Sequence, residues 1–169
     1  INKTKEFGEP GFLYVVDEDQ LLNPCFDISF IPITKDGRCG FQFCNLTSIN
    51  GAKVKSLEDF KNASWAASLI GTLQAAYTSF PYLGHTSEEL TEQEALLGVS
   101  ITGMMDNPDI LFNPEYQREA AKVCVNTNIE WAKKIGVNQA SRVTCIKPEG
   151  TNSIVLSAAS GIHPHHARK

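Results

Sequence analysis

The sequence has no long hydrophobic run, no excess of positive charge and no regular cysteine spacing. Its apolar runs stay below the roughly 18 residues that a membrane-spanning helix needs, and no signal peptide opens the chain. The formal net charge of −4 provides no basic surface for a nucleic-acid polymer, although a single nucleotide needs only a local pocket. These absences predict a cytoplasmic protein that binds neither membranes nor nucleic-acid polymers.

The cysteines are five, an odd number, and they lack regular spacing. This pattern predicts free thiols in a reducing compartment rather than a disulfide scaffold. The C-x₂-C pair of a strong zinc site is also absent. A zinc-binding interaction domain therefore stays only an alternative, and its ligands would come from Cys25, Cys39, Cys44, His163, His165 and His166.

The composition is that of an ordinary globular domain. Hydrophobic residues make up 42% and charged residues 20% of a chain of 169 residues, which is long enough for one domain with its own core. The chain starts at Ile1 rather than at Met and stops without an evident terminal cap. We therefore expect it to be a piece of a longer polypeptide.

Runs of β-branched and aromatic residues predict extended segments. They are a buried strand at 11–16, an extended segment at 41–50 and a strand at 141–147. Pro24 and Pro32 exclude regular helix around Cys25, so this cysteine is expected on a loop or at an edge.

Apolar residues at helical spacing predict two long helices. The first begins after Ser56, an N-cap residue, and is limited by Pro81. The second begins at Asn113-Pro114 and stops at Gly136. The segment 95–106 is interpreted as a helix end or a strand. Strands that alternate with long helices predict a parallel α/β architecture.

The stretch KPEGTNS, residues 147–153, follows the last predicted strand and precedes a possible helix. Gly150 allows close approach of backbone N–H groups, and Thr151 and Ser153 offer hydroxyls, which suits a phosphate. Glu149 opposes this interpretation unless its carboxylate points away. The alternatives are a plain turn and, for the whole chain, a phosphate-binding or nucleotide-binding α/β module without redox activity.

The thiols offer a second chemistry. Cys25 lies between Asn23 and Asp27, and Cys44 follows beyond the turn at 35–40, so the two cysteines could approach one another. Cysteines near a carboxylate suit thiol redox chemistry. We assign Cys124 and Cys145 to the core, because free cysteine is often fully buried.

Three ordered stretches resemble the catalytic domain of ribonucleotide reductases: NPCFDI (23–28), CNLTSIN (44–50), and KPEGTNS with SGIHPHHAR (160–168). The segment EALLGVSITGMMD (94–106) is similar as well. The likeness is greatest to adenosylcobalamin-dependent, class II ribonucleoside-triphosphate reductases, including phage-encoded forms. It implies part of a ten-stranded α/β barrel, namely the finger loop and the second half-barrel. Residues 1–169 would then be one partial catalytic domain, with the finger loop at about 17–40 and the phosphate-binding turn at about 147–153.

The resemblance also implies a role for each matching residue. Cys25 would be the thiyl-radical cysteine, Asn23 would bond the ribose hydroxyls, and Asp27 would be the general base where the family usually has glutamate. Cys44 would be one of the two cysteines that reduce the ribose, with its partner on a strand outside this chain. The residues that bind the substrate phosphates would be Pro148, Glu149, Gly150, Thr151, Asn152 and Ser153.

The activity implied by the resemblance is the reduction of ribonucleotides to 2′-deoxyribonucleotides for DNA synthesis. The implied cofactor is adenosylcobalamin, and the implied partners are the ribonucleotide substrate and a thioredoxin-like or other dithiol reductant. No metal ligand is assigned. The site of action would be the cytoplasm, or the host cytoplasm for a phage protein. We expect the chain to be inactive when it is isolated.

Overall fold

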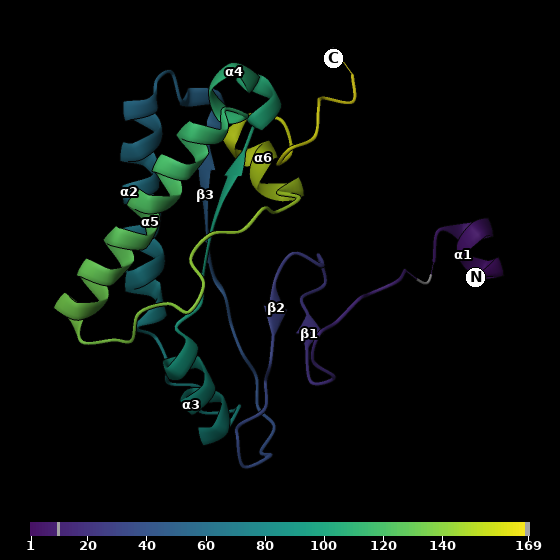
Figure 1. Ribbon diagram of the computed structural model, residues 1–169, viewed down its shortest axis with the longest axis vertical. Coiled ribbons are helices and arrows are strands. Elements are labelled where there is room, and N and C mark those ends of the chain that lie inside the picture. The colour runs from purple at the N-terminus through teal and green to yellow at the C-terminus, as the bar shows by residue number, and fades with distance from the viewer. Residues whose placement is uncertain (10, 168–169) are drawn as a thin grey trace.

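The computed structural model describes residues 1–9 and 11–167, which form helices and short strands (Figure 1). Its strands are β1 (Leu21–Leu22), β2 (Ser29–Phe30), β3 (Asn45–Asn50) and β4 (Leu97–Thr102). Its α-helices are α1 (Asn2–Phe7), α2 (Leu57–Ala75), α3 (His85–Glu94), α4 (Pro108–Leu111), α5 (Pro114–Ile135) and α6 (Gly150–Leu156). Short 3₁₀ turns, Gly51–Lys53 and Met104–Asp106, follow β3 and β4.

The central element is a parallel pair of strands. β3 and β4 are in register from Asn45 opposite Leu97 to Asn50 opposite Thr102, and helix α2 lies between them in the chain. The parallel α/β architecture is therefore confirmed for this pair. The predicted strand at 141–147 is reduced to a single parallel bridge between Thr144 and Val99 of β4. On its other edge, β3 has no strand partner among the residues that the structure describes.

Helices α2 and α5 pack against one another and cover one face of the strand pair (Figure 1). Their contact uses small side chains spaced four residues apart on α2, Ser64, Ser68 and Thr72, which are fully buried. Ser68 Oγ donates to the Cys124 carbonyl at 2.7 Å. Asn128 Nδ2 of α5 donates to Thr72 Oγ1 at 3.0 Å. Small residues let the two backbones approach closely enough for these bonds.

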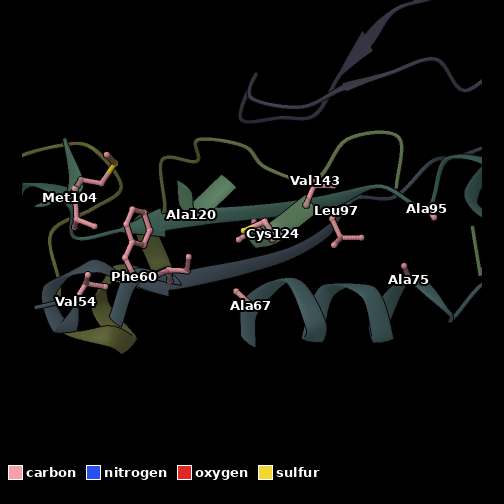
Figure 2. Packing of buried hydrophobic residues seen from close by; sticks show 13 residues of the cluster. Val54, Phe60, Ala67, Ala75, Ala95, Leu97, Met104, Ala120, Cys124 and Val143 are labelled. Atoms are coloured by element: carbon pink, nitrogen blue, oxygen red, sulfur yellow. The ribbon is translucent and has the colours of Figure 1, made fainter. Parts of the chain in front are cut away.

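The core lies between these helices and the strands, as Figure 2 shows. Leu97 and Val99 of β4 meet Phe60 of α2 and Cys124 of α5 there. Cys124 is thus a core residue, as the sequence predicts. Burial of such apolar side chains is worth about 1.5–3 kcal/mol each and supplies most of the stability of this layer.

Both long helices begin where the sequence predicts, because their caps satisfy free N–H groups. Ser56 Oγ accepts from the Asp59 N–H, and Asn113 Oδ1 accepts from the N–H groups of the first turn of α5. Gly136 ends α5 with a φ of 78°. The helix α2 ends at Ala75, before Pro81, and Phe80 packs against Phe43 with ring centroids 4.8 Å apart.

The predicted buried strand at 11–16 is wrong. This segment has no regular secondary structure, and its apolar side chains, among them Phe12, Tyr14 and Val16, are exposed. A strand needs a neighbour for its N–H and C=O groups, and no segment within the described residues pairs with it. The segment leads to α1, which has no buried residue and lies far from the core in Figure 1.

Candidate active site

The Cys25 loop is the tip of a small hairpin between β1 and β2, on the side of the strand pair opposite α2 and α5 (Figure 1). The Phe26 N–H donates to the Asn23 carbonyl at 3.0 Å, which closes a turn with Pro24 in its second position. Phe26 has a φ of 60°, unusual for a large side chain. Cys25 is exposed at this tip, so its predicted place on a loop is confirmed.

The side chain of Asn23 closes the loop from within. Its Oδ1 accepts from the backbone N–H groups of Asp27 at 3.0 Å and Ile28 at 3.1 Å. Its Nδ2 donates to Asp27 Oδ1 at 2.6 Å. An asparagine can make these bonds together because its amide carries both acceptor and donor atoms. The order N-x-C-x-D therefore builds a closed loop in which the amide and the carboxylate that flank Cys25 in the sequence are bonded to one another, while the thiol is exposed.

The second oxygen of Asp27 is held from a distant part of the chain. Lys147 Nζ donates to Asp27 Oδ2 at 3.3 Å, and the two side chains are only 12% and 7% exposed. Burial lowers the pKa of Lys147, but the hydrogen bond and charge of Asp27, with smaller contributions from Cys25 and Cys145, raise it above its ordinary value. Lys147 is consequently charged at neutral pH.

The stretch predicted to bind phosphate begins at Lys147. The Lys147 N–H donates to Ser100 Oγ of β4 at 3.1 Å, and Ser160 Oγ donates to the Pro148 carbonyl at 2.5 Å. Gly150 and Thr151 are exposed beyond this point. Gly150 and Thr151 already belong to helix α6, so the stretch predicted as one turn at about 147–153 is a short irregular segment, fixed at its start, that runs into the exposed first residues of a helix.

The side chain of Glu149, whose negative charge argues against phosphate binding in the sequence, points into the protein. It is 4% exposed, its Oε1 accepts from Ser48 Oγ of β3 at 2.6 Å, and its Oε2 accepts from Asn152 Nδ2 at 2.9 Å. Its φ of 57° is the left-handed conformation that this direction requires. The carboxylate therefore does not lie on the exposed tip of the turn. Ser153 is buried, and its Oγ donates to the Gly150 carbonyl at 3.0 Å.

Two further thiols lie together beside Gly98. A Cβ added to this glycine would lie 2.8 Å from Cys44 Sγ and 3.1 Å from Cys145 Sγ. Burial raises the pKa of Cys44 to about 11, although the nearby Lys147 and Arg142 lower it. Burial and the neighbouring Cys44 raise the pKa of Cys145 to about 12. Both groups are therefore protonated thiols at neutral pH.

Cys145 differs from its prediction as a core residue. It is only partly buried, and its sulfur lies near that of Cys44 beside Gly98. Lys147 is the other residue that the sequence did not single out as functional. A single lysine before a turn forms no recognisable sequence pattern. The only signal that could have indicated a role for Lys147 was its position at the start of the KPEGTNS stretch.

The zinc alternative finds no support in residues 1–9 and 11–167, where no group of three or more His, Cys, Asp or Glu side chains could hold a metal ion. His165 Nε2 instead lies 2.7 Å from Asp106 Oδ1, and His163 Nδ1 lies 3.1 Å from the Ser160 carbonyl. Arg168, within SGIHPHHAR, lies outside the described residues.

A cavity of about 290 Å³ lies on the helix side of the strand pair. Apolar core side chains line it, including Phe60, Val99 and Met104. The lining also includes Cys145 and Ile146, but none of Asp27, Lys147 and Glu149. In the described part of the chain, every helix is too short or too polar to cross a membrane.

Comparison with known proteins identifies the class to which this arrangement is similar. No protein-family model matches the chain. An adenosylcobalamin-dependent ribonucleoside-triphosphate reductase from Euglena gracilis is 23% identical over 175 residues, which cover 92% of this chain and 22% of the relative. The crystal structure of a B12-dependent, class II ribonucleotide reductase matches with a TM-score of 0.65 at 20% identity, over 88% of this chain and 23% of that chain.

The predicted resemblance to class II ribonucleotide reductases is thereby confirmed over nearly the whole chain. The structural match shows that the chain shares the α/β fold of a part of that reductase. The chain spans about a fifth of the length of the curated relative that it matches.

Proposed function

We propose that this chain forms part of the catalytic domain of a ribonucleotide reductase, with ribonucleoside triphosphates as substrates. The observation that carries the proposal is the Cys25 loop, in which Asn23 and Asp27 are hydrogen-bonded at 2.6 Å on either side of an exposed thiol. The likeness of the chain to class II reductases supports it. In this proposal the chain contributes the finger loop and a part of an α/β barrel.

The residues of the loop divide the chemistry between them. The Cys25 sulfur takes the 3′ hydrogen atom of the ribose, and Asp27 accepts the proton of the 3′ hydroxyl. Loss of the 2′ hydroxyl as water is easier from a ribose with a radical at C3′ than from a closed-shell ribose. Asn23 retains one amide hydrogen beyond its bond to Asp27, and this hydrogen is the donor available to a ribose hydroxyl.

The two electrons for the reduction come from two thiols. In the proposal, Cys44 is one of them and becomes half of a disulfide, which a thioredoxin-like or other dithiol then reduces. The raised pKa of Cys44 keeps this group as a neutral thiol until it reacts. The product supplies DNA synthesis in the cytoplasm.

The substrate phosphates bind at the turn 147–153. Support for this assignment comes from the fixed start of the segment at Pro148 and from the exposure of Gly150 and Thr151, the first residues of α6. The inward direction of Glu149 removes the charge that would repel a phosphate from the tip. A phosphate-binding module without redox chemistry would use the same turn, and the experiment below separates the two.

Adenosylcobalamin is the proposed source of the first radical, and its chemistry would be to generate the thiyl radical on Cys25. The described side chains do not form a site for it. His163 and His165 bond other groups of the chain. The 290 Å³ cavity is at the small end of ligand pockets and lies on the helix side. The similarity of the chain to class II reductases is therefore the only support for adenosylcobalamin as the cofactor.

The test is deoxynucleotide formation by the natural polypeptide that carries this chain, with a dithiol and a ribonucleoside triphosphate, in the presence and absence of adenosylcobalamin. We expect product only with the cofactor. The Cys25→Ser variant should form no product and still bind the triphosphate, whereas Cys39→Ser, at an exposed turn, should keep its activity. Undiminished turnover by Cys25→Ser would exclude the radical role. Triphosphate binding without turnover by the wild type would favour the non-redox module.

A further inference from the structure

One ion pair stands apart from the others. Lys147 and Asp27 are 12% and 7% exposed, whereas each other ion pair among the described residues has at least one side chain that is close to half exposed or more. Surface ion pairs contribute little, but a partly desolvated pair resists separation because each charge would be left without its partner. This pair joins the Cys25 loop to a residue 120 positions later in the chain.

The backbone of Lys147 is held in place on two sides. Its N–H donates to Ser100 Oγ, which belongs to β4 and is fully buried. On the opposite side lies Gly161, where any side chain would overlap the carbonyl oxygens of Lys147 and Pro148. Lys147 therefore projects its ammonium group from an irregular segment whose backbone is anchored to β4.

The pair fixes the orientation of the carboxylate. Asn23 holds Oδ1 of Asp27 and Lys147 holds Oδ2, so rotation about the last bond of the side chain would break both contacts. A general base has to lie within hydrogen-bond reach of the proton that it accepts. Aspartate has a shorter reach than glutamate, so its position depends more strongly on what holds it.

We propose that Lys147 is a positioning residue for the base Asp27, and that it links the base to the start of the phosphate turn. This role rests on the proposed reductase function. Pro148 follows Lys147 directly, so the segment that binds the substrate phosphates also carries the group that holds the base. The phosphates and the carboxylate are thereby placed at a fixed separation. We assign Lys147 to the base rather than to the phosphates, since its Nζ is bonded to Asp27 and its side chain is only 12% exposed.

The test uses four variants of the natural polypeptide: Lys147→Met, Lys147→Arg, Asp27→Asn, and the double variant Asp27→Asn/Lys147→Met. Lys133→Met, on the exposed side of α5, is the matched control. We expect Lys147→Met to lower kcat by about 100-fold, the scale of a misplaced reacting group, and to leave KM for the triphosphate nearly unchanged. Lys147→Arg should restore much of kcat, because a guanidinium can also bond the carboxylate.

Stability measurements keep the test informative if Lys147→Met folds poorly. The double variant removes both charges, so the effects of the two substitutions on the unfolding equilibrium constant should deviate from additivity by on the order of tenfold. Additive effects would overturn the contact. A Lys147→Met variant with raised KM and normal kcat would overturn positioning in favour of phosphate binding. A wild type without activity would overturn the reductase function itself, and an active wild type with an equally active Lys147→Met variant would overturn this role alone.

Discussion

At the scale of single residues, the Asn23 side chain determines the shape of the Cys25 loop. Three hydrogen bonds from one amide replace the backbone ladder that a two-residue strand pair is too short to provide. The loop can therefore present an exposed thiol without a hydrophobic core of its own. Because the conformation of the loop depends on the Asn23 side chain, a single substitution can test it.

Replacing Asn23 by Ala should loosen the loop. The N–H groups of Asp27 and Ile28 lose their acceptor, so their amide hydrogens should exchange with solvent about fivefold faster, since each lost bond contributes about 1 kcal/mol. Hydrogen exchange followed by mass spectrometry of the loop peptide measures this. Asn62→Ala, at an exposed position of α2, is the control and should leave the loop unchanged. Unaltered exchange in the loop would contradict the hydrogen bonds assigned to Asn23.

The raised pKa of Cys44 predicts slow alkylation at neutral pH. The thiolate is the reactive form, so the rate constant for Cys44 should still rise about tenfold per pH unit between about pH 7 and 10, whereas a free thiol of pKa about 8.5 levels off. Peptide mapping after alkylation measures this. A plateau of the alkylation rate constant near pH 9 would contradict the burial of Cys44.

The raised pKa also makes the stability of the fold depend on pH. The stability that the buried Cys44 thiol contributes is present below about pH 9, and it is lost as pH rises through about 11, because the folded state keeps the proton to a higher pH than the unfolded state.

Gly98→Ala should destabilise the protein by about 1–3 kcal/mol, the usual cost of overpacking. The added methyl would lie 2.5 Å from Leu46 Cδ2 and 2.8 Å from Cys44 Sγ, so both side chains would have to move. Urea unfolding measures the change, and Gly11→Ala, with no atom within 4 Å, is the matched control. Equal stability of the two variants would mean that the space beside Gly98 is not filled.

At the scale of elements, the contact between α2 and α5 contains a chain of buried polar groups. Ser68 bonds the α5 backbone, Thr72 Oγ1 donates to the Ser68 carbonyl, and Asn128 joins Thr72 to the Ala140 N–H. Each group has a partner in this chain, so the polar atoms align the two helices instead of weakening the core.

Asn128→Ala should therefore be strongly destabilising. Its side chain is 1% exposed, and its loss leaves the Ala140 N–H and the Thr72 hydroxyl without this partner, at a cost of about 2–4 kcal/mol in the free energy of unfolding. Asn126→Ala, on the exposed side of the same helix, should change it by less than about 0.5 kcal/mol. Thermal or urea unfolding distinguishes these outcomes, and similar values for both would contradict the buried network.

The elements with local signals were predictable. Asn113, Pro114 and Gly136 define the ends of α5 through bonds within a few residues, and those signals are complete in the sequence. The segment 11–16 has strand-forming residues, but a strand also depends on a neighbour, which is a property of the fold and not of the segment. The helix α3 went unpredicted because its polar sequence, HTSEELTEQE, carries a weak apolar pattern.

The same distinction applies to the candidate site. The residues Asn23, Cys25 and Asp27 lie within five positions of each other, so their association was visible in the sequence and in the family resemblance. The contact of Asp27 with Lys147, and that of Cys145 with Cys44, join positions about a hundred residues apart. Such pairs are set by the register of β3, β4 and the bridge at Thr144, which the residues alone do not reveal.

At the scale of the whole molecule, the proposed reaction needs more than one cysteine beside the radical thiol. We predict that the isolated 169-residue chain forms no deoxynucleotide, since reduction of the ribose takes two thiols and the proposal assigns only Cys44. A product assay on the purified chain, with the natural polypeptide as control, measures this. Turnover by the isolated chain would point to Cys145, beside Cys44, as the second thiol.

The open edge of β3 has a practical consequence for work with the isolated chain. An unpaired strand edge is a template for extended segments of other molecules, and charged residues or proline, which normally guard such edges, are absent from NLTSIN. The exposed apolar stretch at 11–16 is such a segment. Expression of residues 1–169 alone should consequently give self-association that grows with concentration, so dilute samples or co-expression with a covering sequence are the conditions under which to handle it.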